Sequence, residues 1–205
     1  MNVVRRSLLV TLPAALLAAP WVAALAQRGV PYAELNPPQP VESTGKIEVL
    51  EFFWYGCIHC YNLEPRIETW LKTLPKDVEF RRVPAVFNER WGHDAAIFYA
   101  LEAMGVLDKL HRPLFDAIHR DRLRTDKAEE LTPWLQKHGI DPKKFEATVK
   151  SFGVQSKTRR AVRLTSDYKI DGTPAMAVHG RYTVGAGDGM LETVNQLVAT
   201  VRKTK

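Results

Sequence analysis

Cysteine is scarce in this sequence. Only two cysteines occur among its 205 residues, Cys57 and Cys60, and two residues separate them. A structural zinc site needs four ligands, and the chain has no second Cys-x-x-Cys pair to complete one. A disulfide across so short a gap would constrain very little of the unfolded chain, so a purely structural bridge would add little stability. The pair therefore favours redox chemistry over a metal site or a structural bridge.

Acidic residues are absent from the first stretch of the chain. Residues 1–26 begin with Arg5 and Arg6, continue as an apolar run and end in Ala24-Leu25-Ala26. A basic start, an apolar centre and small residues at the end are typical of a cleaved export signal. We favour this interpretation over a retained membrane anchor. Export would place the two cysteines in an oxidising compartment.

Dense clusters of positive charge, internal repeats and low-complexity tracts are also missing. The net charge of +6 is spread along the chain. After residues 1–26, the notable arginine pairs are Arg81-Arg82 and Arg159-Arg160, and we expect both to face water. This pattern gives no indication of a nucleic-acid-binding surface.

The apolar pattern predicts the order β-α-β, then a block of helices, then β-β-α. Residues 46–56 contain a near-continuous apolar run, which predicts a strand covered on both faces. The period changes at Cys57, where a helix with one apolar face is expected to begin. The further expected elements are a strand at 78–87, helices between 91 and 169 that include two closed by Gly139 and Gly153, a hairpin at 173–186 and a helix from Met190.

The predicted start of a helix at Cys57 indicates how the two thiols differ. Unpaired backbone amides and the helix dipole stabilise an anion at this position, and His59 can add positive charge. Both effects would lower the pKa of Cys57 and make it the nucleophile. Cys60 lies one turn inside the helix and is expected to be the buried resolving thiol. A stabilised thiolate favours the reduced form, so the disulfide should be oxidising.

Glu51 interrupts the apolar strand with a carboxylate. Its neighbours favour a buried position beneath the helix over an edge strand with Glu51 in water. Burial would raise the pKa of this carboxyl and allow it to exchange a proton with Cys60. A last motif, "DGTPAM", places Thr173-Pro174 before a strand, and these residues alone leave the cis or trans state of the bond open.

Together, "EFFWYGCIHC" and "GTPAM" resemble the DsbA family of periplasmic thiol:disulfide oxidoreductases. The resemblance implies an α/β thioredoxin fold with an inserted helical domain. It implies that Cys57 exchanges with substrate, Cys60 resolves, Glu51 is the buried acid and Thr173-Pro174 is a cis bond at the active site. The domain limits that follow are 1–26 for the signal peptide, 27–88 and 170–205 for the thioredoxin fold, and 89–169 for the insertion.

The resemblance also implies substrates and partners. These are unfolded or extended exported polypeptides, and a DsbB-like, quinone-linked membrane protein that restores the disulfide. We expect a monomer without a cofactor other than its own Cys57–Cys60 disulfide. Ile58 and Thr173 are expected to contact substrate. Ile58 replaces a proline and Thr173 a valine of the best-known oxidants, so both should affect the strength of oxidation and the choice of partner.

Two other functions compete with disulfide donation. The first is a disulfide isomerase or a reductase of the same fold, although residues 27–45 are too short for the dimerisation domain of such isomerases. The second is a chaperone-like binder of extended peptides without enzymatic activity. It predicts that Cys57→Ala retains activity in cells, whereas an oxidase would lose it.

Overall fold

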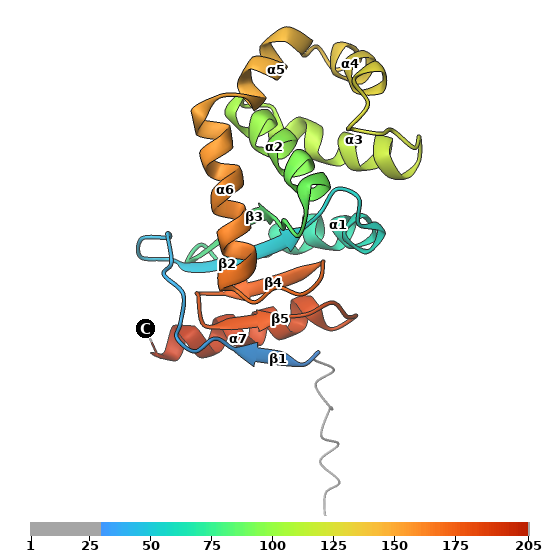
Figure 1. Ribbon diagram of the computed structural model, residues 1–205. Coiled ribbons are helices and arrows are strands. Elements are labelled where there is room, and N and C mark those ends of the chain that lie inside the picture. The colour runs from blue at the N-terminus through green and yellow to red at the C-terminus, as the bar shows by residue number, and fades with distance from the viewer. Residues whose placement is uncertain (1–29, 205) are drawn as a thin grey trace, which may run out of the picture.

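Five strands form one mixed sheet in the order β1-β5-β4-β2-β3 (Figure 1). The computed structural model describes residues 30–204, so the expected export signal at 1–26 lies outside the described residues. Strands β2 and β3 pair in parallel, and the other neighbours are antiparallel. The strands are β1 (Tyr32–Glu34), β2 (Ile47–Phe53), β3 (Val78–Pro84), β4 (Ala175–Val178) and β5 (Tyr182–Val184).

Strand β2 lies at the centre of the molecule and is buried at every position, as its apolar run predicts. Because side chains alternate along a strand, its residues divide between two hydrophobic clusters. Val49 packs with residues of helices α1 (Ile58–Leu71) and α7 (Met190–Thr204). Leu50 and Phe52 pack with residues of the helical block. The sheet is therefore covered on both faces.

The helical block enters the chain between β3 and β4 and lies above the sheet in Figure 1. Helix α6 runs back from this block to the sheet and packs against α2. Within residues 30–204, none of the helices has the length and apolar character needed to cross a bilayer. The helices of the block are α2 (Glu89–Ala103), α3 (Leu107–His119), α4 (Ala128–Lys137), α5 (Pro142–Val149) and α6 (Phe152–Asp167).

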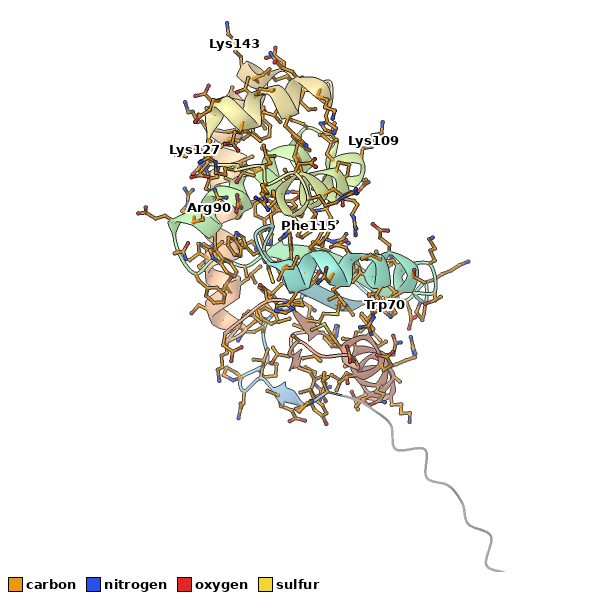
Figure 2. The ribbon with its side chains drawn as sticks, turned by 90° about the vertical axis from the view of Figure 1, so that its right-hand side faces the viewer. Trp70, Arg90, Lys109, Phe115, Lys127 and Lys143 are labelled. Atoms are coloured by element: carbon orange, nitrogen blue, oxygen red, sulfur yellow. The ribbon has the colours of Figure 1, made fainter. Side chains whose placement is uncertain are left out.

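Helix α1 joins the two parts of the molecule. Figure 2 shows Phe115 of α3 where the helical block meets α1, and Trp70 on the side of α1 toward α7. The Trp70 indole Nε1 donates a hydrogen bond of 2.9 Å to Asn195 of α7. Helix α1 is thus fixed from both sides.

Two local predictions about helix ends have different outcomes. Gly139 adopts a φ of +75° directly after the C-cap His138 of α4, as expected for a glycine that ends a helix. The prediction for Gly153 is wrong, because this residue lies inside α6. The side chain of Ser151 accepts a hydrogen bond from the Val154 amide and starts that helix.

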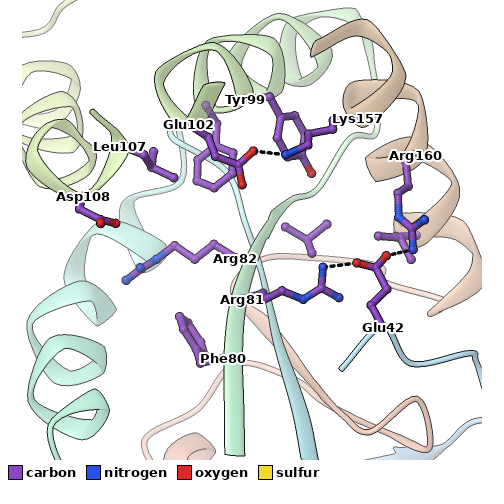
Figure 3. Close-up of a pocket in the computed structure, with 13 residues that line it drawn as sticks. Glu42, Phe80, Arg81, Arg82, Tyr99, Glu102, Leu107, Asp108, Lys157 and Arg160 are labelled. Atoms are coloured by element: carbon purple, nitrogen blue, oxygen red, sulfur yellow. Dashed lines mark hydrogen bonds and ion pairs between the residues drawn. The ribbon is translucent and has the colours of Figure 1, made fainter. Parts of the chain in front are cut away.

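The prediction that Arg81 and Arg82 face water is wrong. Arg81 lies 2.6 Å from a carboxylate oxygen of Glu42 and 2.6 Å from one of the buried Glu48. Arg82 points to the other side of β3, toward α1 (Figure 3). Each arginine pairs with a buried carboxylate, Arg81 with Glu48 and Arg82 with Glu51 and Glu64. A buried carboxylate without a partner is costly, and this cost outweighs the tendency of the arginines to be solvated.

Candidate active site

Cys57 occupies the N-cap position of α1, as the change of period predicts. Its Sγ accepts a hydrogen bond from the Cys60 amide at 3.4 Å. The Cys57 amide in turn donates to the Trp54 carbonyl at 3.0 Å, which fixes the turn between β2 and the helix. Both cysteines are free thiols, so the structure shows the reduced form of the pair.

The surroundings of Cys57 favour its thiolate. Its pKa is lowered from 9.0 to about 5, chiefly by a hydrogen bond from the Cys60 thiol. Partial burial opposes this change, while the Thr173 hydroxyl and the backbone amides of Cys60 and His59 add to it. His59 thus acts on Cys57 through its amide, and the role of its imidazole charge stays a prediction.

Cys60 is in the opposite situation. Its side chain is fully buried, and burial raises its pKa far above the ordinary value. The neighbouring Cys57 and the carboxyl of Glu51 raise it further. At neutral pH the reduced pair therefore consists of one thiolate and one thiol, and only Cys57 is accessible.

The Thr173-Pro174 loop lies against Cys57. When protonated, the Cys57 thiol donates to the Thr173 carbonyl at 3.3 Å, and the Thr173-Pro174 peptide bond is cis, as the family resemblance implies. Pro174 and His59 line a groove of about 350 Å³ beside the cysteines. Ile58 is 48% exposed next to them.

Glu51 is completely buried in β2, which confirms the expectation from the sequence. Burial raises its pKa from 4.5 to about 8, against the effect of Arg82, which lowers it, while the negative Glu64 raises it. Arg82 lies directly opposite in the register of β3, and its Nε is 3.1 Å from a carboxylate oxygen of Glu51. A carboxyl with this pKa can hold a proton near Cys60 at neutral pH.

Four further polar residues at this site were not predicted from the sequence to belong to it. They form a buried cluster behind Glu51, composed of Arg82, Glu64, His111 and Tyr55. Glu64 carried a detectable signal, because it lies four residues after Cys60 on the buried side of α1. His111 carried none, since it belongs to α3 and reaches the site only through the tertiary fold.

Comparison with known proteins assigns the chain to a family. The family model for the DSBA-like thioredoxin domain matches residues 82–198. The thiol:disulfide interchange protein DsbA of Azotobacter vinelandii is 42% identical over 182 residues, covering 86% of this chain and 85% of that protein. This chain belongs to the DsbA family.

Solved structures of DsbA proteins share the fold. The crystal structure of Pseudomonas aeruginosa DsbA superposes with a TM-score of 0.79 at 39% identity, covering 85% of this chain and 94% of that one. An oxidoreductase of Neisseria meningitidis, NmDsbA1, gives a TM-score of 0.75 at 31% identity, covering 89% of this chain and 96% of that one. The DsbA-family fold, a thioredoxin fold with a helical insertion, is thereby confirmed, and the protein is a thiol:disulfide oxidoreductase.

Proposed function

We propose that this protein donates the Cys57–Cys60 disulfide to newly exported polypeptides. The observation that carries this proposal is the contrast between the two thiols. Cys57 has a pKa lowered to about 5, whereas burial keeps Cys60 protonated. The stabilised Cys57 thiolate favours the reduced protein, so its disulfide accepts electrons readily.

The exchange proceeds in two steps. A thiolate of the client attacks Sγ of Cys57, which breaks the Cys57–Cys60 bond and releases Cys60 with the bonding electron pair. The second client thiolate then attacks the client sulfur of the mixed disulfide and releases Cys57 as a thiolate. The client loses two electrons and two protons, and the protein gains the two electrons as a dithiol.

Glu51 supplies the proton that Cys60 needs when it leaves. It is buried near Cys60, and its charge is one of the causes that raise the pKa of Cys60. With its own pKa at about 8, Glu51 is protonated at neutral pH and can give up that proton. Of the two client protons, one restores the proton on Glu51 and the other passes to the solvent, because Cys57 remains ionised.

The groove beside Cys57 is the proposed binding site for the client backbone. Pro174 and His59 line it, and Thr173 and the exposed Ile58 border Cys57 at the same end of α1. We assign substrate contacts to Thr173 and Ile58. No cofactor is needed, because the dithiol itself carries the electrons.

The periplasm and a DsbB-like membrane protein complete the proposal. Residues 1–26 have the pattern of an export signal, and donation requires an oxidising compartment. After each cycle a quinone-linked partner of the DsbB type would accept the two electrons and restore the Cys57–Cys60 bond. We propose that the protein acts as a monomer.

Equilibration of the mature protein with glutathione buffers tests the direction of transfer. An oxidase should have a reduction potential well above that of the glutathione couple. A potential near that of thioredoxin would instead support a reductase. Reactivation of a scrambled disulfide substrate without added oxidant would support an isomerase.

The variant Cys57→Ala separates enzymatic from chaperone-like activity. Loss of client oxidation in cells that lack their own oxidase is the expected result, since no mixed disulfide can form. If the Cys57→Ala variant still restores the folding of client proteins, that result would support peptide binding without catalysis. The exposed Lys143→Ala is a matched control on the distant helix α5, and it should retain full activity.

A further inference from the structure

Two glutamates are buried side by side behind the cysteines, and their surroundings differ. Glu51 of β2 and Glu64 of α1 are both 0% exposed. Neither carboxylate oxygen of Glu51 has a hydrogen-bond partner. Glu64 accepts three hydrogen bonds, two from Arg82 and one from His111. A buried carboxylate without donors is costly to ionise, whereas one with three donors is stabilised as an anion.

Arg82 stands between the two carboxylates and contacts both of them. It lies on the side of β3 that faces α1 (Figure 3). Its Nη2 and Nε donate to Glu64 at 2.9 and 3.3 Å. The same Nε lies 3.1 Å from Glu51, but this contact is an ion pair without a hydrogen bond. The planar fork of the guanidinium is thus occupied by Glu64.

The position of Glu64 is fixed from the helical block. His111 of α3 lies with Nε2 3.2 Å from the Glu64 oxygen Oε1 and with Nδ1 2.9 Å from the Tyr55 hydroxyl. An ionised Glu64 can only accept, so a neutral His111 donates from Nε2 and accepts at Nδ1 from Tyr55. Burial lowers the pKa of His111 and favours this neutral form.

We propose that Glu64 is a positioning residue for the dithiol chemistry: it holds the Arg82 guanidinium in its own hydrogen bonds, so that Glu51 stays without a donor and carries a proton beside Cys60. This inference rests on the proposed function, in which Glu51 protonates Cys60. The charged and titratable groups that face Glu51 are Arg82 from β3, Glu64 and Cys60 from α1, with His111 behind them.

A proton relay through the same cluster is not a workable alternative. Arg82 connects Glu51 to Glu64, and a guanidinium does not release its proton in a protein. The cluster therefore acts on Glu51 through charge and hydrogen bonding.

The test is the titration of Glu51 in the reduced, mature protein. The side-chain carboxyl resonances of ¹³C-labelled glutamate are followed against pH, with Glu51→Gln used for assignment. In Glu64→Gln, Arg82 retains only Glu51 as a negative partner, and the repulsion from Glu64 disappears. The titration midpoint of Glu51 should fall by at least about one pH unit, a tenfold change in its proton affinity.

Glu68→Gln is the matched control. Glu68 lies one turn further along α1 and is exposed, although it borders the same cavity of about 160 Å³ as Glu64 and Arg82. The Glu68→Gln substitution removes the same charge from the same helix and should leave the titration midpoint of Glu51 unchanged. Should Glu64→Gln fail to fold, Glu64→Met removes the carboxylate without leaving a new hydrogen-bonding group.

An unchanged Glu51 midpoint in the Glu64 variants would overturn the proposal, and so would an equal fall in Glu68→Gln. In the wild-type protein Glu64 must titrate below Glu51, and the reverse order would also refute the proposal without any variant. The pH profile of exchange with a dithiol peptide tests the proposed function separately. A lowered Glu51 midpoint with an unchanged profile supports the placement of Arg82 by Glu64 but contradicts the proton transfer from Glu51.

Discussion

The lowered pKa of Cys57 predicts how the stability of the reduced protein changes with pH. The folded-state pKa is about 5 and the unfolded value is 9.0, so folding stabilises the thiolate. This contribution is complete above about pH 9 and disappears as the pH falls through about 5. At about pH 7 its upper limit is about 2.7 kcal/mol, at about 1.36 kcal/mol for each pH unit above the folded pKa. Because Cys57 is only half-buried, water screens the effect, and we expect about 1.4 kcal/mol.

The assay compares urea unfolding of the reduced and the oxidised protein at about pH 7 and about pH 4.5. Most carboxylates titrate alike in both forms, so their contribution cancels in the difference. Glu51 stays protonated over this interval, since its pKa is about 8. The reduced form should lose about 1.4 kcal/mol relative to the oxidised form on acidification, which corresponds to about 30 mV for a two-electron couple.

The ultraviolet absorbance of the thiolate gives an independent check of the same reasoning. In the reduced protein the thiolate absorbance should rise with pH, with a midpoint near pH 5. This absorbance change should be absent from the Cys57→Ser variant. A midpoint above neutral pH would refute the argument. A stability difference between the redox forms that stays constant from neutral to acidic pH would refute it as well.

Three further changes have defined outcomes. Thr173→Val removes a hydroxyl that stabilises the Cys57 thiolate, so the midpoint of the thiolate absorbance should rise, and an unchanged or lower midpoint would contradict this. Gly56→Ala places a methyl group 2.3 Å from the Trp54 ring, which stacks on Trp91, so urea unfolding should show a loss of about 1–3 kcal/mol. Phe115→Ala empties a fully buried position between α3 and α1 and should cost about 3–5 kcal/mol in the same measurement, whereas a loss below about 1 kcal/mol would show that the site collapses.

The chemistry at the helix start was predictable from local sequence. A continuous apolar run that changes to a helical period at Cys57 defines both the strand and the N-cap. Glu51 was predictable for the same reason, because a carboxylate inside such a run has no route to water. These features depend on neighbours in the sequence, which the pattern contains.

The partners of Glu51 depend on contacts between distant segments. Arg82 follows Arg81 in a strand, and two adjacent arginines look like a solvated surface until α1 and β2 are placed beside them. Strand β1 was not predicted, since its pairing partner β5 lies at the other end of the chain. Short pairings of this kind leave no periodic signal.

The strand order has a consequence for how the chain folds. Val49 of β2 lies opposite Val178 of β4, and Tyr32 of β1 lies opposite Val184 of β5. The centre and one edge of the sheet therefore cannot form until the C-terminal part of the chain is present. Closing such long loops is entropically costly, and non-local pairing slows folding. Until β4 arrives, the apolar strand β2 has one edge covered by β3 and the other edge open. That open edge is where an incompletely synthesised chain is most exposed to aggregation.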